Sequence, residues 1–139
     1  MPARNIYHDA VIDALVADGW TITHDPLRVS YGGTDVFVDL AAERAAIAAE
    51  KAGRRIAVEI HSFLLPSPVR DLQEAIGQYD MYRVLLEESE SDRVLYLAVP
   101  NHVYNGILSE PFGRLMVERI GLRLVVFDDL QRRIVRWTE

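Results

Sequence analysis

Three side chains that can bind a metal ion or move a proton lie at the ends of two apolar, alternating segments. Asp39 ends the run VFVD, while Glu59 and His61 end the run RRIAVEIH. Side chains alternate between the two faces of a strand, so Glu59 and His61 are expected on one face. Carboxylate oxygens are the ligands that Mg²⁺ prefers in proteins, together with water and substrate phosphate. The residue types therefore predict a divalent-metal site with a basic group beside it.

Phosphodiester hydrolysis is the chemistry that this arrangement suits. Asp39 and Glu59, with the backbone carbonyl of Ile60, would bind Mg²⁺ or Mn²⁺. His61 would then orient or deprotonate the attacking water. If His61 joined the ligands instead, a softer ion such as Mn²⁺ or Zn²⁺ would be favoured.

Other interpretations of the same residues stay open at this point. Asp35 and Glu43 share the strand face of Asp39 by parity, so either could replace it as the ligand. Glu59 and His61 could also be an ordinary solvent-facing pair on a half-exposed strand, which is the commoner situation. By strand parity alone, Asp35, Asp39 and Glu43 all stay candidates.

The elements that must position these residues follow from hydrophobic periodicity. Helices are predicted over residues 6–19, 68–88 and 110–120, and a short helix or turn over residues 101–106. Strands are predicted over residues 20–23, 27–31, 36–41, 93–99, 122–127 and 134–137. The helix over 68–88 is expected to be the longest. In the helix over 110–120, Phe112, Leu115 and Met116 are expected to face inward.

The alanine-rich segment 39–50 is ambiguous, because its residues suit a helix as well as a strand. We favour a strand in its second half, joined through a turn at Ala52 and Gly53 to the strand that carries Glu59. A strict two-residue turn would place Arg44 opposite His61.

The bulk composition is that of one globular domain over residues 1–139. The chain has no cysteine, which excludes a disulfide framework and a thiolate metal site. No run is long and apolar enough to span a bilayer, and the first residues are unlike a signal peptide, so a cytoplasmic location is expected. The net charge of −6 would repel a polyanion at long range, so a DNA-binding role needs a local basic patch or a bound cation.

Four blocks of the sequence, in order, resemble the fdxN-element excision controlling factor family, called XisH. They are HDAVIDALVADGWTITHDPL, VDLAAERAAIAAEKAGRRIAVEIHSF, DLQEAIGQYDMYRVLL and RVLYLAVP. The resemblance implies the PD-(D/E)xK nuclease superfamily and an α/β fold with a restriction-endonuclease-like three-layer core, in which helices flank a mixed central sheet. It also implies a role in excision of a DNA element, with DNA and a companion excision-control protein as partners.

The resemblance extends to a helix motif of these nucleases, Q-x-x-x-Y, which Gln78 and Tyr82 reproduce. These residues are four apart, so they share one helix face and can both point at the metal pocket. With Asp39 and Glu59 as metal ligands and His61 beside them, they complete the predicted catalytic set.

One residue departs from the family pattern. Members carry VEIKSF where this chain has VEIHSF, so His61 replaces the motif lysine. The only lysine of the chain, Lys51, is far from Glu59 along the sequence. Histidine is mostly neutral near pH 7, so the enzyme is either an altered metal-dependent endonuclease or a degenerate one. The alternative is a non-catalytic interaction module that binds a partner excision factor. The strand over 134–137 is expected at a sheet edge, where it could pair with a second copy in a homodimer.

Overall fold

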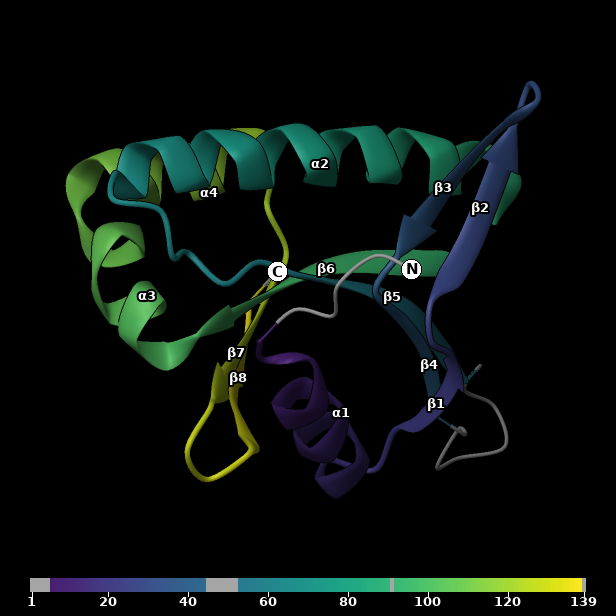
Figure 1. Cartoon of the computed structure of the whole chain (residues 1–139), viewed down its shortest axis with the longest axis horizontal. Coiled ribbons are helices and arrows are strands. Elements are labelled where there is room, and N and C mark those ends of the chain that lie inside the picture. The colour runs from purple at the N-terminus through teal and green to yellow at the C-terminus, as the bar shows by residue number, and fades with distance from the viewer. Residues whose placement is uncertain (1–5, 45–52, 91, 139) are drawn as a thin grey trace.

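The computed structural model describes residues 6–44, 53–90 and 92–138. Within them, helices cover both faces of a central sheet (Figure 1). The elements are, in chain order, α1 (His8–Ala17), β1 (Thr21–His24), β2 (Leu27–Tyr31), β3 (Thr34–Val38), β4 (Leu40–Arg44), β5 (Arg54–Ile60), α2 (Pro68–Ser89), β6 (Arg93–Pro100), α3 (Asn101–Asn105), the 3-10 helix η1 (Ile107–Ser109), α4 (Pro111–Ile120), β7 (Leu124–Asp128) and β8 (Arg133–Trp137).

The central sheet has six strands in the order β1-β4-β5-β6-β7-β8. The pairs β1–β4, β4–β5 and β7–β8 are antiparallel, whereas β5–β6 and β6–β7 are parallel. Parallel neighbours need a crossover, which α2 supplies between β5 and β6, and α3 and α4 supply between β6 and β7. The predicted mixed sheet flanked by helices is therefore confirmed, with β8 at one edge as expected.

Alternation along β4 and β5 sends their side chains into two separate cores. Ile56 and Val58 are fully buried in the core that contains α1. Ala41 and Ala57 are opposite each other in the antiparallel pair and are buried in the core that contains α2. The residues expected to do chemistry share the parity of Ala41 and Ala57, so they lie on the α2 side of the sheet.

Helix α2 begins and ends close to its predicted bounds. Ser67 caps its N-terminus by accepting a hydrogen bond from the backbone N–H of Arg70 at 3.3 Å, and Pro68 follows in the first turn. Tyr79, fully buried, anchors the middle of the helix to the sheet, because its hydroxyl donates to the carbonyl of Leu95 at 3.4 Å. None of the helices in the described ranges is long and apolar enough to cross a membrane.

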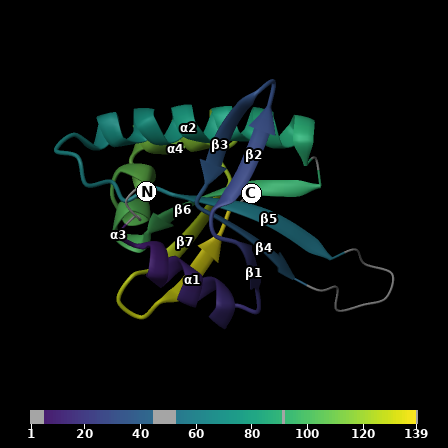
Figure 2. The same ribbon diagram turned by 45° about the vertical axis from the view of Figure 1, so that its right-hand side comes forward.

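The strand predicted over 36–41 is in fact two strands, interrupted at Asp39. β3 pairs only with β2, in a two-stranded sheet, and β4 belongs to the central sheet. Figures 1 and 2 show the β2–β3 hairpin extending from the central sheet past α2. A single alternating run in the sequence cannot reveal that β3 and β4 belong to different sheets, because the alternation of side chains is the same whichever strand is the partner.

The predicted register of the β4–β5 hairpin is wrong. Arg44 is opposite Arg54, not His61, and its guanidinium contacts the ring of Trp20 and the carboxylate of Asp18 instead. The strand of the central sheet occupies the first part of the segment 39–50. The favoured strand in the second half and the turn at residues 52–53 involve residues 45–52, outside the described ranges.

The orientation predicted for α4 is also wrong in part. Phe112 and Leu115 are about half exposed, and Met116 is partly buried. The helix packs through Gly113, where a Cβ atom would clash with the backbone carbonyl of Ile107. A backbone contact of this kind leaves no signal in hydrophobic periodicity.

Candidate metal centre

Asp39 lies at the bend between β3 and β4, beside the end of β5. Its Oδ2 atom accepts the backbone N–H of Ile60 at 2.8 Å, and its own backbone N–H donates to Oε1 of Glu59 at 3.3 Å. These two hydrogen bonds fix the two carboxyl groups against each other. The β4–β5 register, continued by one residue, puts Asp39 directly opposite Glu59.

Glu59 is almost completely buried, with 5% of its surface exposed. Burial, together with the hydrogen bond to Asp39 and the negative charge of Asp39, raises the pKa of Glu59 from 4.5 to about 10. At neutral pH the Glu59 carboxyl group therefore carries a proton. A divalent cation would replace that proton and restore the negative charge of Glu59.

Helix α2 contributes Gln78 and Tyr82 to the same region. The hydroxyl of Tyr82 is hydrogen-bonded to Glu59. Burial, and then the charge of Glu59, raise the pKa of Tyr82 to about 12, so this phenol stays a hydrogen-bond donor. The four-residue spacing puts both side chains on the helix face that meets the end of β5.

These residues line one pocket of about 330 Å³, formed by Phe37, Asp39, Glu59, Ile60, His61, Ser62, Gln78 and Tyr82. All five residues predicted to form the site are thus brought together. Their roles in catalysis and metal binding remain predictions. Phe37 and Ser62 were not singled out from the sequence, although Phe37 has the same strand parity as Asp39.

His61 contacts a carboxylate that sequence reasoning missed. Its Nε2 atom is 3.4 Å from Oδ1 of Asp71, and its ring lies edge-on to Phe63. Asp71 is buried in the first turn of α2, where its Oδ2 also accepts the backbone N–H of Leu65 at 3.0 Å. The available signal was weak: an acidic residue four positions after the helix cap Ser67 is common for reasons of helix stability alone.

The two alternative ligands lie elsewhere. Asp35 is on the β2–β3 hairpin, 3.4 Å from the Nε atom of Arg28, and Glu43 accepts a hydrogen bond from Arg55 at 3.0 Å. Neither lines the pocket that contains Asp39 and Glu59.

The donor set fits a hard, mostly hydrated ion. Two adjacent carboxylates in a polar pocket suit Mg²⁺ or Mn²⁺, which keep several waters and need few protein ligands. No group of three or more His, Asp or Glu side chains suited to a metal occurs among the described residues. With the Nε2 of His61 against Asp71, a zinc site of nitrogen and oxygen ligands is not favoured.

Comparison with known proteins shows the family to which the chain belongs. The sequence model of a family described as XisH protein matches residues 1–135. The chain belongs to the XisH family. Two solved structures of similar proteins agree with this assignment. An XisH family protein from Nostoc punctiforme PCC 73102 is 36% identical, with 97% of this chain and 100% of that chain covered and a TM-score of 0.88.

The second is an fdxN element excision controlling factor protein from Anabaena variabilis. It is 37% identical to the chain, with 98% of this chain and 100% of that chain covered and a TM-score of 0.86. No curated protein matches the chain. Both XisH-family structures extend over the β2–β3 hairpin as well as the central sheet, because they cover almost all of the chain.

Proposed function

We propose that this XisH-family chain acts in excision of a DNA element through a metal-dependent, nuclease-like site of the PD-(D/E)xK type. The observation that carries the proposal is the contact between Asp39 and Glu59, two carboxyl groups held together in a polar pocket with no guanidinium or ammonium group among its lining residues. The role in excision is suggested by the similar protein from Anabaena variabilis, an fdxN element excision controlling factor.

The five residues predicted from the sequence have distinct parts in the proposed phosphodiester hydrolysis. Asp39 and Glu59 would bind Mg²⁺ or Mn²⁺, and the ion, when bound, supplies charge stabilisation at the phosphoryl oxygens and a more acidic water. Tyr82 holds the Glu59 carboxylate by a hydrogen bond. Gln78 and His61, which both line the pocket, would orient the attacking water.

Incubation with plasmid DNA and Mg²⁺ or Mn²⁺ tests this proposal. We expect cleavage by the wild-type chain and its loss in Asp39→Ala. Glu43→Ala is the matched control, because it removes a carboxylate of the same strand face that lies outside the pocket. Equal cleavage by wild type and Asp39→Ala would identify a contaminating nuclease and remove the proposal.

A second candidate function is a non-catalytic module that binds a companion excision-control protein. Two observations favour it. His61, at the position where the family resemblance implies a lysine, contacts Asp71, and the loop after β5 exposes Leu64 and Leu65. An apolar pocket of about 370 Å³, lined in part by Phe63 and residues of α3 and η1, lies beside this loop.

His61→Lys separates the two candidates. If this change alone confers metal-dependent cleavage on an inactive wild type, the chain is a degenerate nuclease. A pull-down from its own host then tests the binding role. Loss of the companion protein on Leu64→Asp, with retention in Asp39→Ala, is the result expected of the interaction module.

A further inference from the structure

The outer face of the β2–β3 hairpin lies beside the metal pocket. Leu27, Val29 and Val38 are buried, and they share the core that contains α2. Arg28 and Phe37 point the other way, because neighbouring side chains of a strand alternate. They are direct partners in the antiparallel register. The hairpin thus presents a cation and an aromatic ring, side by side, to solvent.

Phe37 places its ring at the rim of the pocket. The residue is 51% exposed, and it lines the pocket together with Asp39 and Glu59. It makes no ring contact with the other aromatic side chains that the structure describes. Phe37 lies two positions before Asp39, which in extended chain is about 7 Å between their Cα atoms. A flat apolar surface is therefore available about one nucleotide away from the carboxyl pair.

Arg28 keeps most of its hydrogen-bonding capacity free. Its side chain is 66% exposed, and both of its contacts use Nε, which is 3.3 Å from Oγ of Ser30 and 3.4 Å from Oδ2 of Asp35. The two terminal nitrogens make no hydrogen bond or ion pair with the described residues. A guanidinium presents such a pair of donors in a geometry that matches a phosphate group.

We propose that this face of the hairpin binds a single strand of DNA, with one unpaired base stacked on Phe37 and a neighbouring phosphate bound by Arg28. The inference rests on the proposed function, since the next phosphate of the strand would reach Asp39 and Glu59. A base inside a duplex is covered on both faces, so only an unpaired or extruded base can stack on Phe37. The substrate class is therefore single-stranded or flap DNA.

The charge of the protein supports this choice over a duplex. A chain with a net charge of −6 is repelled less by a single strand, which carries half the charge per unit length of a double helix. Stacking on an aromatic ring adds affinity that does not depend on net charge, and it tolerates any base sequence.

Fluorescence anisotropy with a labelled 20-nucleotide single strand and the matching duplex tests the inference. EDTA in the buffer keeps the DNA intact. We expect tighter binding of the single strand, about tenfold weaker binding in Phe37→Ala, and retained binding in Phe37→Tyr. Tyr31→Ala is the matched control, because Tyr31 is a 59% exposed aromatic at the tip of the same hairpin, and it should bind like wild type. Arg28→Ala should weaken binding and reduce its salt dependence.

The outcomes separate this inference from the nuclease proposal. Equal affinity for single strand and duplex, or identical binding by Phe37→Ala and Tyr31→Ala, overturns the single-strand site even if plasmid cleavage is observed. If single strands bind in a Phe37-dependent way but no metal-dependent cleavage is seen, the single-strand site is supported and the nuclease proposal is refuted. A thermal unfolding midpoint equal to that of the wild type verifies that each variant is folded.

Discussion

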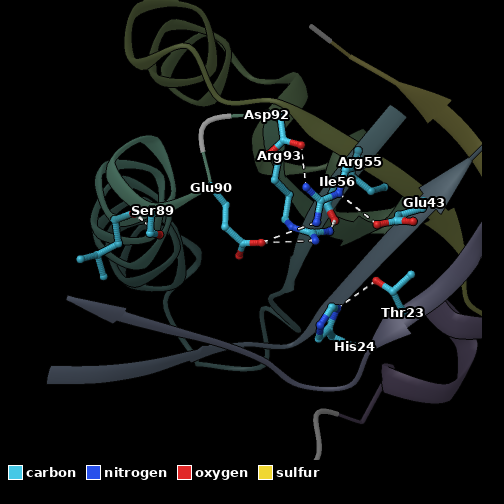
Figure 3. Close-up of polar contacts among 10 residues, drawn as sticks. Thr23, His24, Glu43, Arg55, Ile56, Ser89, Glu90, Asp92 and Arg93 are labelled. Atoms are coloured by element: carbon cyan, nitrogen blue, oxygen red, sulfur yellow. Dashed lines mark hydrogen bonds and ion pairs between the residues drawn. The ribbon is translucent and has the colours of Figure 1, made fainter. Parts of the chain in front are cut away.

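Two clusters of charged side chains lie at opposite ends of the β4–β5 pair, on the same face of the sheet. At one end Arg55 contacts Glu43 at 3.0 Å and Asp92 at 2.6 Å (Figure 3). At the other end Asp39 and Glu59 contact each other. The first cluster pairs its carboxylates with a guanidinium, and the second pairs two carboxyl groups.

The pKa values express this difference. A hydrogen bond from Arg55 lowers the pKa of Asp92, whereas burial and Asp39 raise the pKa of Glu59 to about 10. Paired opposite charges stabilise the fold and do not require a bound cation. Two carboxyl groups held together oppose their own ionisation, and a bound cation relieves that opposition. This difference supports the proposal that the first cluster is structural and that the second binds a cation.

The largest effect is expected from Arg93, which anchors the structural cluster. Its side chain is fully buried, and it donates to the carbonyl of Ile56 at 3.0 Å and lies 3.5 Å from Glu90 (Figure 3). Arg93→Ala should lower the free energy of unfolding by about 3 kcal/mol, because it leaves buried groups without their partner. Urea denaturation measures this. An unchanged denaturation midpoint would contradict the structural role.

A smaller effect of opposite sign is expected at Glu59. Its pKa is higher in the folded protein than in the unfolded chain, so its contribution to stability is present at acidic pH and is lost as pH rises from about 4.5 towards about 10. Glu59→Gln cannot ionise, and in metal-free buffer at pH 8 it should be more stable than wild type by about 2 kcal/mol. Thermal unfolding in EDTA between pH 5 and 9 should show the difference growing with pH.

Glu43→Gln is the control for this prediction. Glu43 is ion-paired with Arg55, so its loss should slightly destabilise the protein at pH 8. If Glu59→Gln and Glu43→Gln changed stability in the same direction, the contrast between the two clusters would be refuted.

The smallest effect is expected from Tyr82→Phe, which removes the hydrogen bond to Glu59. Because it acts only through that bond, it should weaken Mn²⁺ binding by about tenfold. Tyr104→Phe is a suitable comparison, since the Tyr104 hydroxyl accepts a hydrogen bond from Arg136 away from the pocket. Equal Mn²⁺ affinity in Tyr82→Phe and wild type would exclude the supporting role of Tyr82.

The sequence predicted the elements with strong periodicity. The long helix and the apolar strand after it lie within a residue or two of the expected bounds, because their patterns and their Pro68 and Pro100 boundaries are local. The break at Asp39 was missed because it depends on which strand each half pairs with. The exposure of Phe112 and Leu115 was missed because α4 packs through the backbone at Gly113.

The members of the site were predicted more completely than its internal contacts. Parity and the family resemblance together indicated Asp39, Glu59, Gln78 and Tyr82, which line one pocket. The contact of His61 with Asp71 was not predicted, because the conformation of the loop between β5 and α2 determines where Asp71 lies relative to His61. The spacing of residues in the sequence does not predict that loop conformation.

The central claim is that Asp39 and Glu59 form a metal site that holds a proton until a cation binds. Calorimetric titration of Mn²⁺ into the protein at pH 8, in two buffers of different ionisation enthalpy, tests it directly. We predict one ion bound per chain with release of about one proton, both abolished in Asp39→Asn and unchanged in Glu43→Gln. Absence of binding, or equal binding and proton release in Asp39→Asn, would contradict the account.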